Sequence, residues 1–187
     1  MKNEGAPPDW DALYEIAAAQ AGYFTLGDAV AVGFSAPLLQ YHCGRRVERA
    51  GRGIFRLRHF PVTEQEDLVT IWLWTEKTGV FSNETALQLH GLSDVLPANH
   101  HLTVPAKWRH RRLRVPQGVA LAFRNYKPDE VAWHGPVPVT TPLRTLQDCV
   151  EDHALPNILE AAIRQAVERG LVNLSEIETL KKGAPTP

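Results

Sequence analysis

Long apolar runs and cysteines are both scarce in this sequence of 187 residues. No stretch of about 18 apolar residues is present, so the sequence predicts no membrane-spanning helix. The opening residues, MKNEGAPPDW, lack the apolar segment of a secretory signal peptide, and we expect a cytoplasmic protein. The two cysteines, Cys43 and Cys149, lie far apart in predicted helices, which argues against a disulfide framework or a thiolate metal cluster.

Recognisable catalytic motifs are missing as well. The eight histidines form no HExxH motif and no paired Cys/His spacing. His100 and His101 are adjacent, so in a strand they would point to opposite faces and could not easily share a metal ion. No GxSxG elbow, P-loop or GxGxxG motif is present. We therefore expect no catalytic residue, no metal site and no cofactor.

A metal-dependent nuclease is the enzyme that competes best with this expectation. Its active site would need clustered carboxylates, and four are available: Asp94, Asp129, Glu130 and Asp148. None of them belongs to an acidic-x-Lys pattern on a predicted strand.

Arg144 precedes Asp148 by one helical turn, so we expect a salt bridge between the two, with a contact to a partner or to nucleic acid as the alternative.

Positive charge is not abundant in total, but it is concentrated locally. The chain carries 20 Lys and Arg against 21 Asp and Glu, for a net charge of −1. Residues 42–58 nevertheless hold six arginines and one glutamate, and residues 107–114 hold five cations and no acid. Because a local positive potential attracts anionic partners whatever the net charge, the first segment in particular is a candidate surface for nucleic acid.

Residues 25–57 have the pattern of a winged helix-turn-helix. Thr25 followed by Asp28 is a capping box, and Ser35 with a proline two residues later marks the start of a second helix. One glycine separates the two helices, another ends the second, and an arginine-rich hairpin follows. A supporting helix is expected before them, over residues 10–21.

The outward face of the second of these helices predicts the DNA contacts. Helical spacing places Gln40, Tyr41 and Arg45 opposite its apolar side. Glutamine can bond an adenine edge and arginine a guanine edge, so these residues are candidates for base recognition. The alternative is that Tyr41 packs under the hairpin, which alone would touch phosphate. Strand alternation adds three candidate contacts from the hairpin: Arg49, Arg52 and Arg56.

The rest of the chain alternates predicted helices with short strands. Thr63 with Glu66 opens an apolar helix, Ser82 caps another, and Ser175 with Glu178 caps the last. Strands are expected within VFS, HHLTVP, VALAFRNY and VPVT. The predicted fold class is α+β: a winged helix-turn-helix domain at 1–60, a mixed α/β domain with a small sheet flanked by helices at 61–182, and a disordered tail at 183–187.

Several of these motifs resemble the AbiE-type (AbiEi family) antitoxins, which are abortive-infection transcriptional regulators paired with nucleotidyltransferase toxins. In the N-terminal part the resemblance rests on Gly33, Phe34, Ser35, Leu39, Gly44, Arg45 and the ending GRGIFRL. In the C-terminal part it rests on the order of SNETALQLHGL, HLTVP, the basic run and VPVTTPLRTLQD. The resemblance covers about residues 10–172, most of the chain.

The resemblance implies a DNA-binding autorepressor of its own promoter and an antitoxin that counters a nucleotidyltransferase toxin encoded in the same operon. Two copies are expected on repeated half-sites, because winged heads gain specificity by pairing. Three interpretations stay open for the basic run Lys107, Arg109, Arg111, Arg112 and Arg114: a solvated loop, a second DNA contact, or a surface for an acidic partner. The alternative functions are a winged helix that binds a protein without DNA and, less favoured, a DNA nuclease.

Overall fold

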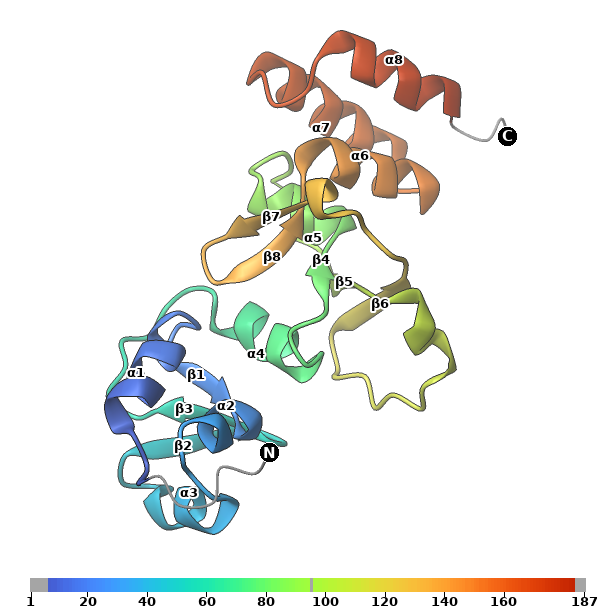
Figure 1. Ribbon diagram of the computed structural model, residues 1–187. Coiled ribbons are helices and arrows are strands. Elements are labelled where there is room, and N and C mark those ends of the chain that lie inside the picture. Colours follow the sequence, from blue (N-terminus) through green and yellow to red (C-terminus); the bar gives the residue numbers. More distant parts are fainter. Residues whose placement is uncertain (1–6, 95, 184–187) are drawn as a thin grey trace. The chain divides into compact units, whose positions relative to one another are not determined.

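The computed structural model describes residues 7–94 and 96–183, with side chains up to residue 178. The chain divides between Lys77 and Thr78 into two compact units (Figure 1). The sequence predicts this boundary after residue 60 instead. It lies later because helix α4 (Glu66–Trp74) packs on the sheet of the first unit.

Three short helices begin the first unit, and each starts at a side-chain cap. They are α1 (Trp10–Ala18), α2 (Leu26–Ala31) and α3 (Ala36–His42). The Asp9 carboxylate accepts the N–H of Ala12 at 2.9 Å. Thr25 and Asp28 form the expected capping box, in which the Thr25 N–H donates to the Asp28 carboxylate at 2.9 Å. Ser35 caps α3, so local sequence alone fixes where these helices begin.

A three-stranded antiparallel sheet in the order β1-β3-β2 completes the first unit. Its strands are β1 (Tyr23–Thr25), β2 (Val47–Gly51) and β3 (Ile54–Leu57). The β2–β3 hairpin is the predicted one, with a register shift between Arg49 and Gly51. The sequence does not predict β1. The predicted first helix extends to Ala21, whereas α1 ends at Ala18 and the short strand β1 follows it. Between them the chain turns at Gly22, whose φ of +87° suits glycine.

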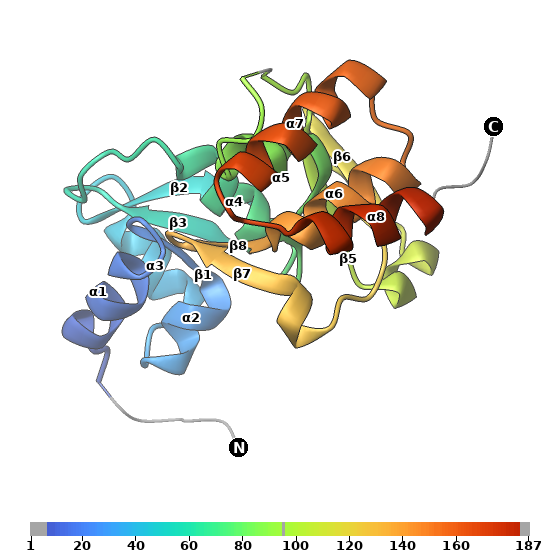
Figure 2. The same cartoon turned by 90° about the horizontal axis from the view of Figure 1, so that it is seen from above.

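The two faces of this sheet are covered by different helices. Phe24 and Phe55 pair across β1 and β3 and face α1, α2 and α3, which lie together on one side of β2 and β3 (Figure 2). The other buried members of that core are Leu13, Ala17, Ala29, Phe34, Leu39 and Val47. Tyr23 and Arg56 form the neighbouring pair and face the opposite side, where Glu66 of α4 bonds both. Helix α4 therefore closes the second face.

The second unit is built on a five-stranded mixed sheet in the order β6-β5-β4-β8-β7. The strands are β4 (Val80–Phe81), β5 (His100–Val104), β6 (Val119–Phe123), β7 (Val131–His134) and β8 (Val137–Thr140). Strand β5 is parallel to β6 and β4 to β8, and the other two pairings are antiparallel. The sequence predicts every one of these strands except β7, because VAWH is short and shows no alternation of apolar and polar residues.

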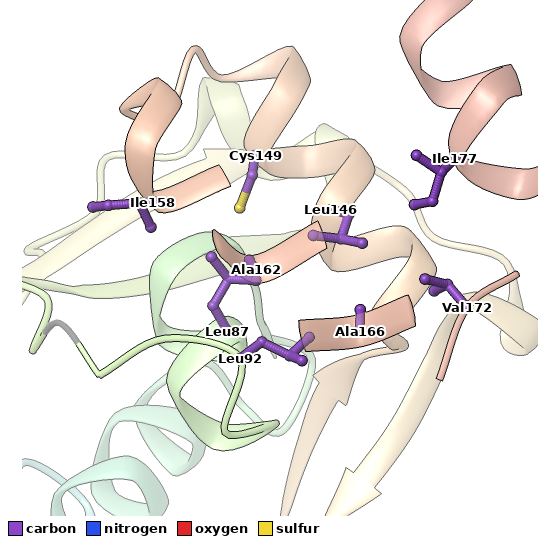
Figure 3. Close-up of a cluster of buried hydrophobic side chains, with 9 residues drawn as sticks. All are labelled: Leu87, Leu92, Leu146, Cys149, Ile158, Ala162, Ala166, Val172 and Ile177. Atoms are coloured by element: carbon purple, nitrogen blue, oxygen red, sulfur yellow. The ribbon is translucent and has the colours of Figure 1, made fainter. Parts of the chain in front are cut away.

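Helices α5 and α6 pack on this sheet, and α7 packs on α6. The helices are α5 (Asn83–Leu89), α6 (Pro142–Glu151), α7 (Pro156–Glu168) and α8 (Leu174–Gly183). Figure 3 shows the apolar cluster that they enclose: Leu87, Leu92, Leu146, Cys149, Ile158, Ala162, Ala166, Val172 and Ile177. Cys43 and Cys149 are both free, and burial raises the pKa of the Cys149 thiol to about 12. The molecule is thus α+β with two small sheets.

Two predicted helix starts are wrong. Helix α4 begins at Glu66 without a side-chain cap, rather than at Thr63. The last helix is capped by Asn173, whose side-chain oxygen accepts the Glu176 N–H at 2.9 Å, and not by Ser175. The tail expected at 183–187 lies outside the described residues except for residue 183, the end of α8. No helix in the described ranges is long and apolar enough to cross a membrane.

Candidate functional site

Helix α3 and Arg45, three residues beyond its end, present the predicted contact residues of the helix side together. Gln40 and Tyr41 are exposed, Tyr41 to 62%, which contradicts the alternative in which Tyr41 packs under the hairpin. Arg45 follows the end of α3, and its guanidinium lies 4.7 Å from the centre of the Tyr41 ring. This cation–π contact positions an exposed arginine beside Gln40 and Tyr41 at the end of the helix.

The β2–β3 hairpin adds two exposed arginines from the predicted set. Arg49 lies on β2 and donates from Nε to the Gly51 carbonyl at 3.4 Å. Arg52 occupies the turn, next to Gly53 with its φ of +73°. No ion pair within the described part of the chain involves either arginine. The tip of the hairpin therefore carries positive charge that is available to an anionic ligand.

Arg46 is a further exposed cation that the sequence prediction omits. Its guanidinium lies 4.9 Å from the centre of the Trp10 ring. Trp10 is itself held edge-on against Phe34 at 4.7 Å and His42 at 4.9 Å between ring centres. Because the stacking joins α1 to the segment after α3, no local pattern in the sequence could reveal it.

Arg56 does not belong to this surface, which corrects the sequence prediction. Its side chain is only 12% exposed and pairs with Glu66 at 3.0 Å, while two backbone carbonyls accept its remaining N–H groups. Strand alternation turns Arg56 out of the core as expected, but α4 covers that face of β3. Arg58, beyond the strand, stays exposed and lies 3.6 Å from Glu48.

The second basic run folds around a buried tryptophan. It begins with the short 3₁₀ helix η1 (Ala106–His110), in which Trp108 is buried. Arg111 stacks over Trp108 at 4.1 Å, and Arg109 lies over the Phe123 ring of β6 at 5.8 Å. All five predicted cations are exposed: Lys107, Arg109, Arg111, Arg112 and Arg114. The η1 part of this run borders strand β6, because η1 packs against that strand and Arg109 lies over Phe123.

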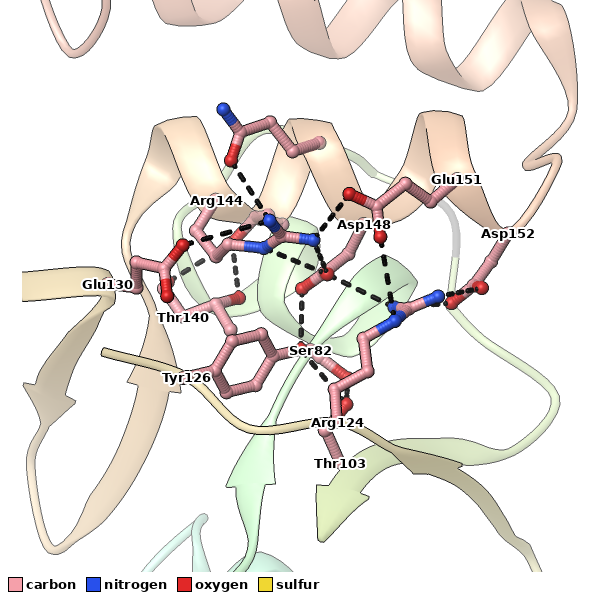
Figure 4. Close-up of polar contacts among 12 residues, drawn as sticks. Ser82, Thr103, Arg124, Tyr126, Glu130, Thr140, Arg144, Asp148, Glu151 and Asp152 are labelled. Carbon is pink, nitrogen blue, oxygen red and sulfur yellow. Dashed lines mark hydrogen bonds and ion pairs between the residues drawn. The ribbon is translucent and has the colours of Figure 1, made fainter. Parts of the chain in front are cut away.

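A buried polar network lies between α6 and the sheet of the second unit (Figure 4). The carboxylate of Asp148 is fully buried, and Arg144 donates to it from Nε at 3.0 Å and Nη2 at 2.6 Å, as the sequence predicts. Arg124 donates to the same carboxylate at 3.1 Å, and the Tyr126 hydroxyl donates at 2.7 Å. Arg144 also bonds Glu151 at 2.8 Å. Two arginines and one tyrosine therefore share a single buried carboxylate.

Burial and pairing shift the pKa values of this network. Burial, reinforced by the charge of Asp148, raises the pKa of Tyr126, so its hydroxyl remains a donor. Burial by itself would lower the pKa of Arg124, but the hydrogen bond and charge of Asp152 raise it above its ordinary value. Burial would raise the pKa of Asp152, but its bonds to Arg124 and Asn83 lower it. Arg124 and Arg144 are held in ion pairs with Asp148 and Asp152, and Tyr126 stays a neutral donor, which gives the network a structural role.

A groove of 690 Å³ opens beside β6. Ala120 and Ala122 of β6 contribute small side chains to its lining, and Asn83 and His153 line it from α5 and the α6–α7 loop. Asn83 is 5% exposed, and its side-chain oxygen has no hydrogen-bond donor within the described residues. No sequence pattern reveals this groove, since its lining residues come from five separate segments.

The carboxylates that a nuclease would need are not gathered at one place. Asp148 and Glu130 lie beside Arg144, at 2.6 Å and 3.7 Å, whereas Asp94 and Asp129 are exposed. Across residues 7–94 and 96–183, no group of three His, Cys, Asp or Glu side chains is placed to hold a metal ion. The site with the most ordered polar contacts is the ion-pair network around Asp148.

The fold and its exposed arginines define a two-unit α+β protein with a basic surface on each unit. A family model described as the AbiEi antitoxin C-terminal domain matches residues 78–186, which is more than half of the chain. The match begins at the first residue of the second unit. The chain therefore belongs to the AbiEi antitoxin family, and the resemblance stated from the sequence is confirmed. Membership supports the role of an antitoxin in a toxin-antitoxin system.

A solved structure with a similar fold is the crystal structure of the RV2827C protein from Mycobacterium tuberculosis. It shares 15% sequence identity with this chain at a TM-score of 0.55. The alignment covers 98% of this chain and 76% of that one, and at this identity the likeness concerns the fold alone. A comparison with curated proteins found no match.

Proposed function

We propose that the first unit is a winged helix-turn-helix with which this antitoxin binds the promoter of its own operon and represses it. The observation that carries the proposal is the set of exposed side chains on α3 and the hairpin: Gln40, Tyr41, Arg45, Arg49 and Arg52. The element order α1-β1-α2-α3-β2-β3, with a tight turn at Gly33, supports the same interpretation. The proposal includes no catalytic step, and its setting is the cytoplasm, where the promoter is accessible.

The contacts divide between base recognition and phosphate binding. With α3 in a major groove, Gln40 and Arg45 are the side chains that could reach base edges. Arg46, Arg49 and Arg52 would neutralise phosphates and so add affinity without selecting a sequence. Helix α3 spans seven residues and contains no arginine. We therefore expect modest discrimination by one chain and stronger discrimination by two chains on repeated half-sites.

A gel-shift experiment with the full chain tests promoter binding. The probe is the native upstream region of the gene, and the control is a duplex of the same composition in shuffled order. Gln40→Ala and Arg45→Ala should reduce the preference for the native duplex by about 1–3 kcal/mol each, whereas Arg52→Ala should weaken binding to both duplexes alike.

Two results would count against the proposal. Equal binding of the native and shuffled duplexes would show that the chain does not recognise the promoter sequence. Absence of any shift would leave the alternative in which the winged helix binds a protein. A preference that survives both substitutions on α3 would instead move base recognition to another part of the molecule.

We further propose that the toxin is a nucleotidyltransferase encoded beside this gene, as in the family that the sequence resembles. Expression of that neighbour alone should arrest growth, and co-expression of this chain from an unrelated promoter should restore it. An Arg49→Ala/Arg52→Ala variant serves as the control, because it separates loss of repression from loss of neutralisation. Growth arrest that the intact chain does not relieve would refute the antitoxin pairing.

A further inference from the structure

Strand β6 forms one edge of the five-stranded sheet, and its outer side has no backbone partner within the described residues. On the inner side, the Gly118 carbonyl accepts a hydrogen bond from β5 and the Arg124 N–H donates one to β5. Because parallel pairing alternates along a strand, the N–H and C=O groups of Val119, Leu121 and Phe123 point outward. These groups can receive another strand.

This edge lacks the features that protect edge strands from such pairing. Natural edges carry a lysine, a proline, a bulge or an inward-pointing charge. Strand β6 reads Val-Ala-Leu-Ala-Phe, its pairing with β5 runs without a register shift, and all five of its residues are partly exposed. An unprotected apolar edge of this kind indicates a place where another chain adds a strand.

The groove beside β6 provides room for the side chains of an added strand. Ala120 and Ala122 project toward it, and their small size leaves the volume of 690 Å³ open. The unpaired side-chain oxygen of Asn83, buried at its wall, is an acceptor for a donor from the incoming strand or from a water beside it. Backbone groups would supply affinity, and the groove would select side chains.

The charge around the edge indicates the chemistry of the partner. Lys107, Arg109, Arg111, Arg112 and Arg114 are exposed without an acid among them in the sequence, and Arg109 lies over Phe123 of β6 and lines the groove. Of the two acids that line the groove, Asp152 bonds Arg124, and Glu84 lies 4.0 Å from the His101 imidazole. We propose that β6 binds an extended segment of a partner protein rich in aspartate and glutamate, which adds to the sheet as a further strand.

Two other occupants fit this surface less well. Duplex DNA could use the cations, but it has no strand of N–H and C=O groups to pair with Val119, Leu121 and Phe123. A second copy of this chain paired through β6 would bring two basic runs together, and like charges across an interface oppose association. The proposed partner uses both the edge and the charge, and the proposal does not depend on promoter binding.

The test measures binding of a fluorescein-labelled peptide, EETVTVTVEE, to the full chain by fluorescence anisotropy. The matched control peptide is KKTVTVTVKK, which has the same strand propensity and the opposite charge. The acidic peptide should bind at least about tenfold more tightly than the basic one. Arg112→Glu/Arg114→Glu should abolish this difference. Leu121→Pro should weaken the acidic peptide, since it removes only an outward N–H, and proline is tolerated at such positions.

Amide hydrogen exchange on the unsubstituted chain provides a readout that does not depend on how the variants fold. The acidic peptide should slow exchange at Val119, Leu121 and Phe123 and leave the β5-bonded amides of Ala120 and Ala122 nearly unchanged. Binding without this alternating pattern would overturn strand addition. Equal affinity for the two peptides, or no binding of either, would overturn the proposal as well.

Two controls identify the competing occupants. In the first, a short DNA duplex of random sequence competes with the acidic peptide for the Arg49→Ala/Arg52→Ala variant. Displacement of the peptide would show that the basic run binds DNA. A dimer in analytical ultracentrifugation that Leu121→Pro dissociates would make β6 a homodimer interface. Either result would overturn the proposal. Peptide binding by Arg49→Ala/Arg52→Ala equal to that of the unsubstituted chain would support it even if promoter binding fails.

Discussion

Asp148 is the residue on which the polar contacts of the second unit converge. Its carboxylate is fully buried and accepts hydrogen bonds from Arg144, Arg124 and Tyr126. Removing one partner of a buried ion pair leaves an uncompensated charge, which is more costly than the pair is favourable. The network therefore makes the packing of α6 on the sheet sensitive to single substitutions.

Arg144→Ala should lower the free energy of unfolding by about 3 kcal/mol, because Asp148 loses the arginine that donates two hydrogen bonds to its Oδ1 atom. Urea denaturation followed by circular dichroism measures the change. Arg112→Ala is the matched control and should alter stability by less than about 0.5 kcal/mol, since that side chain is exposed. A loss from Arg144→Ala no larger than that of the control would show that Arg124 and Tyr126 are enough to satisfy Asp148.

His90 makes the stability of the second unit depend on pH. Burial lowers its pKa below the ordinary value, although its Nε2 lies 2.7 Å from the Thr140 carbonyl. The unfolded chain therefore binds a proton that the folded chain does not, and stability should decrease as the pH falls through about 6.5. Between pH 8 and about 5, the melting temperature should decrease less for His90→Gln than for the unsubstituted chain. The same pH dependence in both proteins would exclude His90 as its source.

At the scale of the element, the β2–β3 hairpin separates arginines with different roles. Arg52 lies exposed at its turn, and Arg56 on β3 is paired with Glu66 of α4. Arg56→Ala should lower the melting temperature and leave DNA affinity nearly unchanged at a temperature where the variant is folded. Arg52→Ala should do the reverse, since it removes a proposed phosphate contact at the surface. Differential scanning fluorimetry and fluorescence anisotropy measure the two effects.

A double variant, Arg56→Ala with Glu66→Ala, tests the origin of the stability effect. If the ion pair is responsible, Glu66→Ala should destabilise the Arg56→Ala variant less than it destabilises the unsubstituted chain. Full additivity of the two losses would mean that the pair contributes no coupling energy. A loss of DNA affinity from Arg56→Ala equal to that from Arg52→Ala would return Arg56 to the DNA surface.

The helices that begin at local caps could be predicted from the sequence. The capping box of Thr25 and Asp28 involves residues three apart, and the hydrogen bonds of the structure reproduce it. A similar pattern at Thr63 and Glu66 is not used, since α4 begins three residues later. Strands β1 and β7 are short, and pairing with distant partners rather than their own residue pattern defines them.

The candidate site could be predicted only where its geometry is local. Helical spacing was sufficient to place Gln40 and Tyr41 on an exposed face. Arg46 was missed and Arg56 was misplaced, because their contacts are with Trp10 and Glu66 on other helices. Charge counts along the chain find cationic segments, but tertiary packing decides which cations reach the surface.

At the scale of the whole molecule, the boundary after Lys77 assigns α4 to the first unit. A fragment of residues 1–77 should unfold cooperatively on heating, whereas residues 1–60 should not, because the face of the sheet that carries Tyr23 and Arg56 would lose its cover. Circular dichroism measures both melts. Cooperative unfolding of the shorter fragment would show that α4 is dispensable and would favour the boundary predicted from the sequence.

Binding of the native upstream duplex through exposed arginines of the first unit is the central proposal, and its salt dependence tests it most directly. If Arg46, Arg49 and Arg52 each neutralise a phosphate, the slope of log K against log salt should be about −2.7 for each bound chain. For the Arg49→Ala/Arg52→Ala variant it should fall to about −0.9. A binding constant that does not change with salt, or a slope that the two substitutions leave unaltered, would contradict the proposal.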